Sequence, residues 1–160
     1  MAINVTDSQL TKVYLVPTGT DVSTAGAIET AISTAKELIC IQTFGEIGST
    51  RAVTEYKCID TTDSTKSLGS FSLPNIPVQF LFDATDVEGQ AELRAMYPAG
   101  TRKIMIVALN DQITPTTGNP TYRTFTAACS AENMAIAIDT AVMQNYTIEI
   151  MSLPATILAT

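Results

Sequence analysis

The sequence contains no histidine and no tryptophan, and only 16% of its 160 residues are charged. The missing histidine removes the most common general base, the most common metal ligand and every histidine-containing catalytic triad. The three cysteines (Cys40, Cys58 and Cys129) are widely spaced and form no CxxC pair. This spacing excludes a disulfide framework and a structural zinc site. We interpret all three as small buried residues of a protein kept in a reducing compartment.

Long apolar runs and a recognisable signal peptide are also missing. The longest apolar run, from Ile104 to Leu109, is far shorter than the roughly 18 residues that a membrane-spanning helix needs. The N-terminal residues MAINVTDSQL have neither the basic nor the apolar region of a secretory signal. We therefore expect no membrane partner and a chain that is made and kept in the cytoplasm.

Positive charge is scarce. Nine Lys and Arg residues face sixteen Asp and Glu residues, and only Arg102 and Lys103 are adjacent cations. Tight nucleic-acid binding needs clustered cations, so it is not expected. Hydrophobic residues make up 46% of the chain, which leaves much apolar surface for a partner to cover. Composition thus favours an obligate assembly.

No group of residues predicts catalysis. The paired carboxylates Asp60/Asp63 and Asp83/Asp86 lie in turn or helix-cap contexts that explain them without a reaction. The segment Gly45–Gly48 lacks the third glycine and the following helix of a phosphate-binding loop. We predict neither an enzyme nor a bound cofactor or metal.

Most of the remaining pattern is typical of β-strands. Alternating or β-branched runs predict strands at residues 12–16, 39–44, 76–82, 102–110, 121–130 and 145–153, with Met134, Ile136 and Ile138 continuing the alternation. In residues 76–82, the apolar face (Ile76, Val78, Phe80 and Phe82) would line a core. Residues 102–110 are apolar on both faces, which is typical of a strand buried on both sides.

One helix is clearly indicated. Thr85–Glu88 forms a capping box, in which the Thr85 side chain meets the Glu88 N–H. Leu93, Met96 and Tyr97 share one face, and the helix should end within Pro98–Gly100. A weaker helical pattern lies within residues 21–38. The short connections favour antiparallel pairing, so we predict one domain over residues 1–160, an antiparallel β-sandwich or half-barrel with one short α-helix.

The segment Gly45–Gly69 is mostly polar, with short β-like patches at Ala52–Val53 and Tyr56–Ile59. A loop of this length is uncommon in a compact domain and is usually functional or ordered by a partner. The alternative is a mobile surface hairpin.

The ordered set of pieces between Thr43 and Lys103 resembles the tail tube (major tail) proteins of long-tailed, siphovirus-like bacteriophages. The matching pieces are Gly45–Glu46–Ile47, Thr50–Tyr56, Asp63–Gly69, and Phe82–Asp83 leading into Gly89–Gln90. No single piece is diagnostic, and the resemblance rests on their order.

This resemblance implies hexameric rings that stack axially, with strands of each subunit completing an inner β-barrel. DNA would pass through the tube without specific binding. The implied partners are further copies of the chain and the tape-measure, tail-tip and tail-terminator proteins. The implied location is the virion tail, assembled in the host cytoplasm.

Two sets of residues follow as hypotheses. Charges of the long loop would pair between rings: Arg51, Glu55, Lys57 and Lys66. Polar residues of the strands would face the lumen: Gln79, Glu132, Asp139, Thr147 and Glu149. The alternative for both sets is an ordinary solvated surface.

Two other functional classes stay open. The first is the inner tube of a contractile tail or injection system, which shares the architecture. The second is a monomeric β-sandwich binding module, such as a capsid decoration or adhesin domain. The C-terminal tail, residues 154–160, is either an arm that reaches the next subunit or a frayed end.

Overall fold

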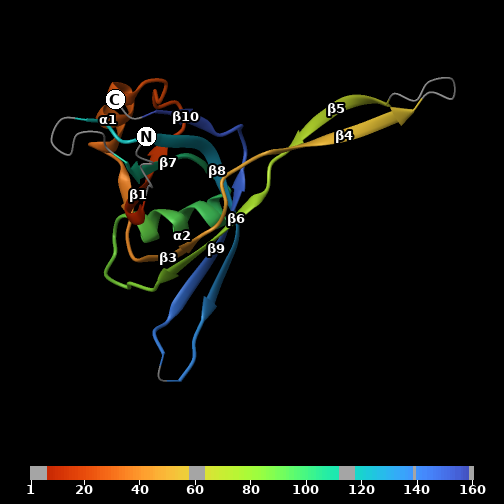
Figure 1. Cartoon of the computed structure of the whole chain (residues 1–160). Coiled ribbons are helices and arrows are strands. Elements are labelled where there is room, and N and C mark those ends of the chain that lie inside the picture. Colours follow the sequence, from red (N-terminus) through yellow and green to blue (C-terminus); the bar gives the residue numbers. More distant parts are fainter. Residues whose placement is uncertain (1–6, 58–63, 112–117, 139, 159–160) are drawn as a thin grey trace.

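The computed structural model describes residues 7–57, 64–111, 118–138 and 140–158, and its body is one curled antiparallel sheet (Figure 1). The eight strands of this sheet are β1 (Asp7–Pro17), β2 (Lys36–Leu38), β3 (Ile41–Phe44), β6 (Asn75–Leu81), β7 (Arg102–Asn110), β8 (Tyr122–Ala135), β9 (Met143–Ile150) and β10 (Ala155–Ile157). Their order is β2-β1-β7-β8-β9-β6-β3, and β10 pairs with the start of β8. A separate hairpin pairs β4 (Thr50–Lys57) with β5 (Ser64–Ser72). The mainly-β, antiparallel prediction is confirmed.

Strand β7 is buried on both faces, as its sequence predicts. Met105 and Val107 belong to the main core, which fills the inside of the curled sheet. Ile106 and Ala108 belong to a second apolar cluster on the other face. Each face of the strand therefore packs against a different layer, which explains the absence of polar alternation.

Helix α2 (Gly89–Ala99) lies inside the curve of the sheet (Figure 1). Leu93 and Met96 are buried in the main core. Tyr97, predicted on the same face, is exposed because the last turn of the helix extends beyond that core. A Cβ at Gly89 would lie 2.1 Å from the Glu37 carbonyl oxygen, so glycine is what lets the helix approach β2.

The predicted capping box is wrong. Asp86, not Thr85, satisfies the start of α2, because its carboxylate accepts hydrogen bonds from the N–H groups of Glu88 (2.7 Å) and Gln90 (2.9 Å). The Thr85 hydroxyl instead donates to the Asp83 carboxylate at 2.7 Å. Gly100 ends the helix in the left-handed conformation (φ 60°), as predicted.

The weaker helical pattern corresponds to α1 (Ala25–Ile32), which packs on the second cluster through Ile28 and Ala31. Among the described residues, neither helix has the length and hydropathy needed to cross a membrane.

The strand predicted over residues 39–44 begins only at Ile41. Cys40 has φ 60° and separates β2 from β3. Cys40 is also exposed, so the prediction of a buried cysteine is wrong there, whereas Cys129 is buried. Cys58 lies outside the described residues.

Candidate assembly surfaces

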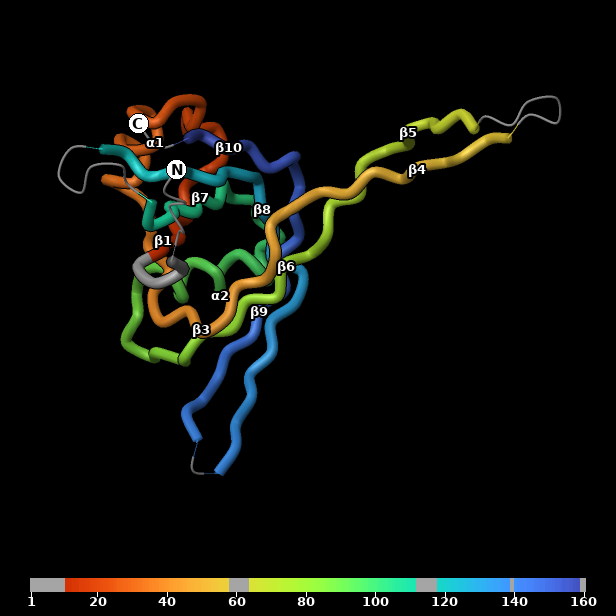
Figure 2. Tube along the Cα trace, viewed as in Figure 1, coloured from red at the N-terminus to blue at the C-terminus, as the bar shows by residue number. Residues whose placement is uncertain are grey.

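The β4–β5 hairpin projects far from the body (Figures 1 and 2), and every described residue of its two strands is exposed. The segment predicted as a long polar loop over residues 45–69 is instead strand over most of its described length, and it forms a surface hairpin, which was the alternative. The sequence shows no alternation of apolar and polar residues here, because both faces of the hairpin lie in solvent and neither has to be apolar. Residues 58–63, which join the strands, lie outside the described ranges.

The structure brings two of the four predicted inter-ring charges together. Glu55 lies directly opposite Lys66 in the register of β4 and β5, and Lys57 lies opposite Ser64. The Arg51 guanidinium lies 4.0 Å from the centre of the Phe71 ring. These charges stand on an exposed arm, where a partner can reach them. Their role between rings stays a prediction.

The same hairpin also exposes apolar side chains. Val53 lies opposite Leu68, and both are exposed, as is Tyr56. A two-stranded hairpin is marginally stable by itself in water. Contact with another molecule would cover these side chains and stabilise the arm.

The base of the hairpin is fastened to the body. The Gly45 N–H donates to the Pro77 carbonyl at 2.9 Å, and a Cβ at Gly45 would lie 2.5 Å from Pro77 Cδ. Arg123 donates to the Ile47 carbonyl (3.4 Å) and to Thr156 Oγ1 (2.9 Å), which joins the hairpin base to β10. Sequence reasoning missed Arg123, since a single arginine in an alternating strand carries no distinctive signal.

Three of the five predicted lumen residues share one face of the sheet. Gln79 of β6 lies opposite Asn145 of β9, and their side chains form a 3.0 Å hydrogen bond. Thr147 and Glu149 follow Asn145 at every second position of β9 and therefore lie on the same face. The Glu149 carboxylate accepts a 2.7 Å hydrogen bond from the Ser130 hydroxyl. This face is polar, and the opposite face is core.

Glu132 does not lie with those three residues. It is paired with Tyr146 and accepts hydrogen bonds from the Tyr146 hydroxyl (3.4 Å) and the Gln144 amide, which are on the core side of β9. A register shift between Cys129 and Ala131 reverses the alternation, and nothing in the sequence announces it. Burial, assisted by the Glu132 charge, raises the pKa of Tyr146. Asp139 lies outside the described residues.

The section of sheet that carries this polar face has two open edges. Within the described ranges, strand β3 pairs with β6 alone. On the other side, β8 pairs with β7 only as far as Ala128, so residues 130–135 have β9 as their single strand partner in the described part of the chain. Unpaired strand edges offer backbone donors and acceptors to another chain.

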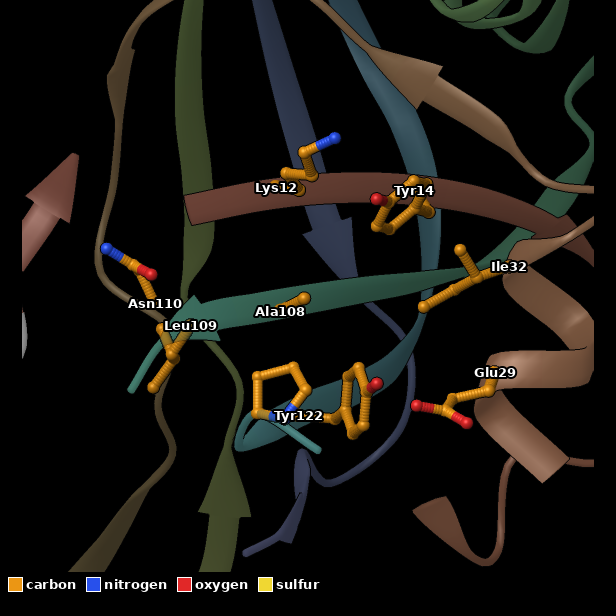
Figure 3. Close-up of a pocket in the computed structure, with 9 residues that line it drawn as sticks. Lys12, Tyr14, Glu29, Ile32, Ala108, Leu109, Asn110 and Tyr122 are labelled. Atoms are coloured by element: carbon orange, nitrogen blue, oxygen red, sulfur yellow. The ribbon is translucent and has the colours of Figure 1, made fainter. Parts of the chain in front are cut away.

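A groove of about 550 Å³ lies between α1 and strands β1, β7 and β8 (Figure 3). Tyr14 and Tyr122 line it, and burial raises the pKa of both. The Tyr122 hydroxyl points toward the Glu29 carboxylate, which also raises that tyrosine's pKa. No predicted site residue lies in this groove.

The described residues contain no group of three or more cysteine, aspartate or glutamate side chains able to hold a metal ion. Burial raises the pKa of the Cys129 thiol to about 11, so this thiol is protonated at neutral pH and is not an activated nucleophile.

The fold is a mainly-β half-barrel of the tail-tube type. No known family model and no curated protein matches the sequence, but solved structures match the fold. The SPP1 tail tube is similar at 15% identity with a TM-score of 0.65, over 96% of this chain and 81% of that one. The tail of a gene transfer agent (GTA) particle with C6 symmetry is similar at 10% identity (TM-score 0.63; 94% and 98% covered).

Contractile systems match equally well. The sheath/tube terminator of the extracellular contractile injection system PVC is similar at 10% identity with a TM-score of 0.70, over 98% of this chain and 99% of that one. The likeness therefore spans components of phage tails and injection systems. It does not separate a siphovirus-like tail from a contractile one.

Proposed function

We propose that this chain is a structural, non-enzymatic virion protein that polymerises into stacked hexameric rings. These rings form the hollow tail tube through which phage DNA is delivered. The observation that carries the proposal is the section formed by β3, β6, β9 and the end of β8. It is open at both edges, polar on one face and packed on the core with the other.

Ring closure would pair those open edges. The β3 edge of one copy would meet the β8 end (residues 130–135) of the next, and repetition would close a barrel. Closure removes the unpaired backbone groups and the risk of uncontrolled edge-to-edge association. The polar face would then line the lumen, while each copy keeps its own core outside.

An acidic lumen would repel DNA and keep it from adhering, since charges in a narrow conduit act within the screening distance of about 8–10 Å. Glu149 tests this assignment. A Glu149→Lys tube should eject DNA more slowly than the wild type, because DNA phosphates would be attracted to each ring. Glu29→Lys, at an exposed position of helix α1, makes the same charge change away from this face and is the control. Ejection at the wild-type rate from the Glu149→Lys tube would remove Glu149 from the lumen.

The β4–β5 hairpin would reach the neighbouring ring and become covered there. Replacing Arg51 and Glu55 with alanine should block tube growth. It should change the free energy of unfolding of the monomer by no more than about 0.5 kcal/mol, because both side chains are exposed. The control is Lys12→Ala with Glu37→Ala, which removes an exposed ion pair of the body (3.3 Å). Tubes of normal length from the Arg51/Glu55 variant would contradict this role.

The direct test is electron microscopy of the purified protein after concentration and ageing, with and without tail-tip complex as initiator. We expect rings or hollow tubes of uniform diameter. Monomers alone under both conditions would overturn the tube proposal and favour a monomeric binding module. The tape-measure, tail-tip and tail-terminator partners, and the location in the virion tail, are part of the same proposal.

A second candidate function is the inner tube of a contractile tail or injection system. The similarity to the PVC sheath/tube terminator favours it. A sheath protein encoded beside this chain, and sheath binding by the assembled tube, would distinguish it from a non-contractile tail.

A further inference from the structure

Strand β8 carries an apolar stripe that begins inside the body. Phe125, Ala127 and Cys129 are buried in the main core at every second position. After the register shift, Met134 lies opposite the buried Gln144, on the core side of β9. Glu132, opposite Tyr146 on the same side, interrupts the stripe, which resumes at Met134 toward the end of the β8–β9 hairpin.

Beyond the body this stripe loses its cover. The exposed fraction rises from 49% at Met134 to 73% at Ile136 and 91% at Ile138. The intervening residues are alanines, so residues 134–138 read MAIAI and contain no charge. We call Met134, Ile136 and Ile138 the tip patch. Two isoleucines this exposed at the end of a projecting hairpin mark a contact surface.

A second uncharged segment lies at the opposite end of the same hairpin. Strand β9 starts opposite Ala135, near the tip patch, and ends at Ile150. Directly after it, residues 151–158 read MSLPATIL and also contain no charge. Met151 and Leu153 in this segment are exposed at 42% and 50% and form what we call the exit patch.

The two patches are well separated. The eight residues of β9 span about 25 Å at roughly 3.3 Å per residue. Figure 2 shows the hairpin tip and the segment leading into β10 on opposite sides of the body. The tip patch therefore cannot cover the exit patch of its own chain.

We propose that the tip patch of one copy packs against the exit patch of the copy in the next ring. Two different patches at opposite ends of one subunit form a heterologous contact, which repeats without limit along an axis. Both patches are uncharged and lack apolar cover, so their union removes apolar surface from water without burying a charge. This inference rests on the proposed function and identifies an axial contact separate from the β4–β5 hairpin.

Crosslinking between differently marked copies tests the contact. Ile138→Cys and Leu153→Cys are prepared as separate proteins in a Cys40→Ser, Cys58→Ser background. The two are mixed, assembled, and treated with a short bifunctional maleimide. We expect a covalent dimer in the assembled mixture, and at least a roughly tenfold weaker one when either protein is treated alone. The matched control mixes Leu153→Cys with Val87→Cys, which is also highly exposed (78%, compared with 91% at Ile138) and should give no dimer.

A second variant tests the energetic role. Ile136→Ser with Ile138→Ser should still form rings, but the amount of assembled tube should fall roughly tenfold at equal protein concentration, the effect of losing one modest apolar contact. Val87→Ser should assemble normally.

The outcomes separate the two proposals. Tubes that form without a 138–153 crosslink, or a wild-type amount of tube from the serine variant, would overturn the tip-to-exit contact and leave the tube function standing. A wild-type chain that never assembles would overturn the tube function and this contact with it.

Discussion

The molecule projects two antiparallel hairpins from one body, and they are built in different ways. Along β9 buried and half-buried residues alternate, so one face of the β8–β9 hairpin belongs to the core. Along β4 and β5 every residue is exposed. A one-residue register slip in the first hairpin would move its core side chains to the solvent-exposed face. A slip in the second hairpin would lose only the contacts between paired side chains of the two strands. The core therefore specifies the register of β9 in the first hairpin, whereas no burial specifies the register of the second.

The largest effect should come from the core that packs against the first hairpin. Phe80 of β6 is fully buried, with its ring edge-on to Tyr146 at 5.8 Å. Phe80→Ala should lower the free energy of unfolding by about 3–5 kcal/mol. Leu68→Ala, in exposed β5, should change it by no more than about 0.5 kcal/mol. Urea denaturation of the monomers measures both changes. Equal losses of stability would show that the two hairpins do not differ in how the core supports them.

The junction between body and arm should respond less strongly. Gly45→Ala forces a Cβ against the Pro77 ring and should cost about 1–3 kcal/mol. Gly48, three residues further toward the arm, has open space where a Cβ would lie, with no neighbouring atom within 4 Å, so Gly48→Ala should be nearly neutral. Thermal unfolding of the two variants locates where the rigid body ends. Similar melting temperatures would show that the arm is not fastened at Gly45.

The smallest effect is a dependence on pH. Burial raises the pKa of the Cys129 thiol to about 11, compared with 9.0 for an ordinary thiol. The folded state therefore holds this proton more tightly. The resulting stability is fully present below pH 9 and is lost as the pH rises through about 11.

Cys129→Ala removes this contribution. Between pH 9 and 11 the wild type should lose about 1–2 kcal/mol more stability than the variant. The same two proteins compared at about pH 7 control for the change in packing, since the thiol is then protonated in both the folded and the unfolded state. Parallel losses at high pH would show that the thiol is not held by the core.

Sequence patterns predicted those parts of the fold in which burial imposes a period. Ile76, Val78 and Phe80 are buried as expected, and the doubly apolar residues 102–110 form the doubly buried β7. The prediction for Phe82 was less complete: it lies just beyond β6 and is partly exposed, with the Arg94 guanidinium 5.6 Å from its ring centre. Periodicity identifies a buried face well, but it does not show where a strand stops.

The candidate surfaces were predicted less evenly. Gln79, Thr147 and Glu149 share the polar face because they lie on strands with regular register. Glu132 was placed with them by alternation and lies on the other face, since one extra residue at Ser130 changes the phase of β8. The polar segment after Gly45 offered no period at all, because nothing in the monomer buries either of its faces.

The sequence by itself determined the β-rich class, the clear helix before Gly100 and the absence of histidine chemistry, since these depend on composition and local period. Only the tertiary structure decided that Arg123 holds the hairpin base and that apolar patches lie at both ends of the β8–β9 hairpin. These features join residues far apart in the chain, and their contacts arise from how the sheet curls, which no local pattern records.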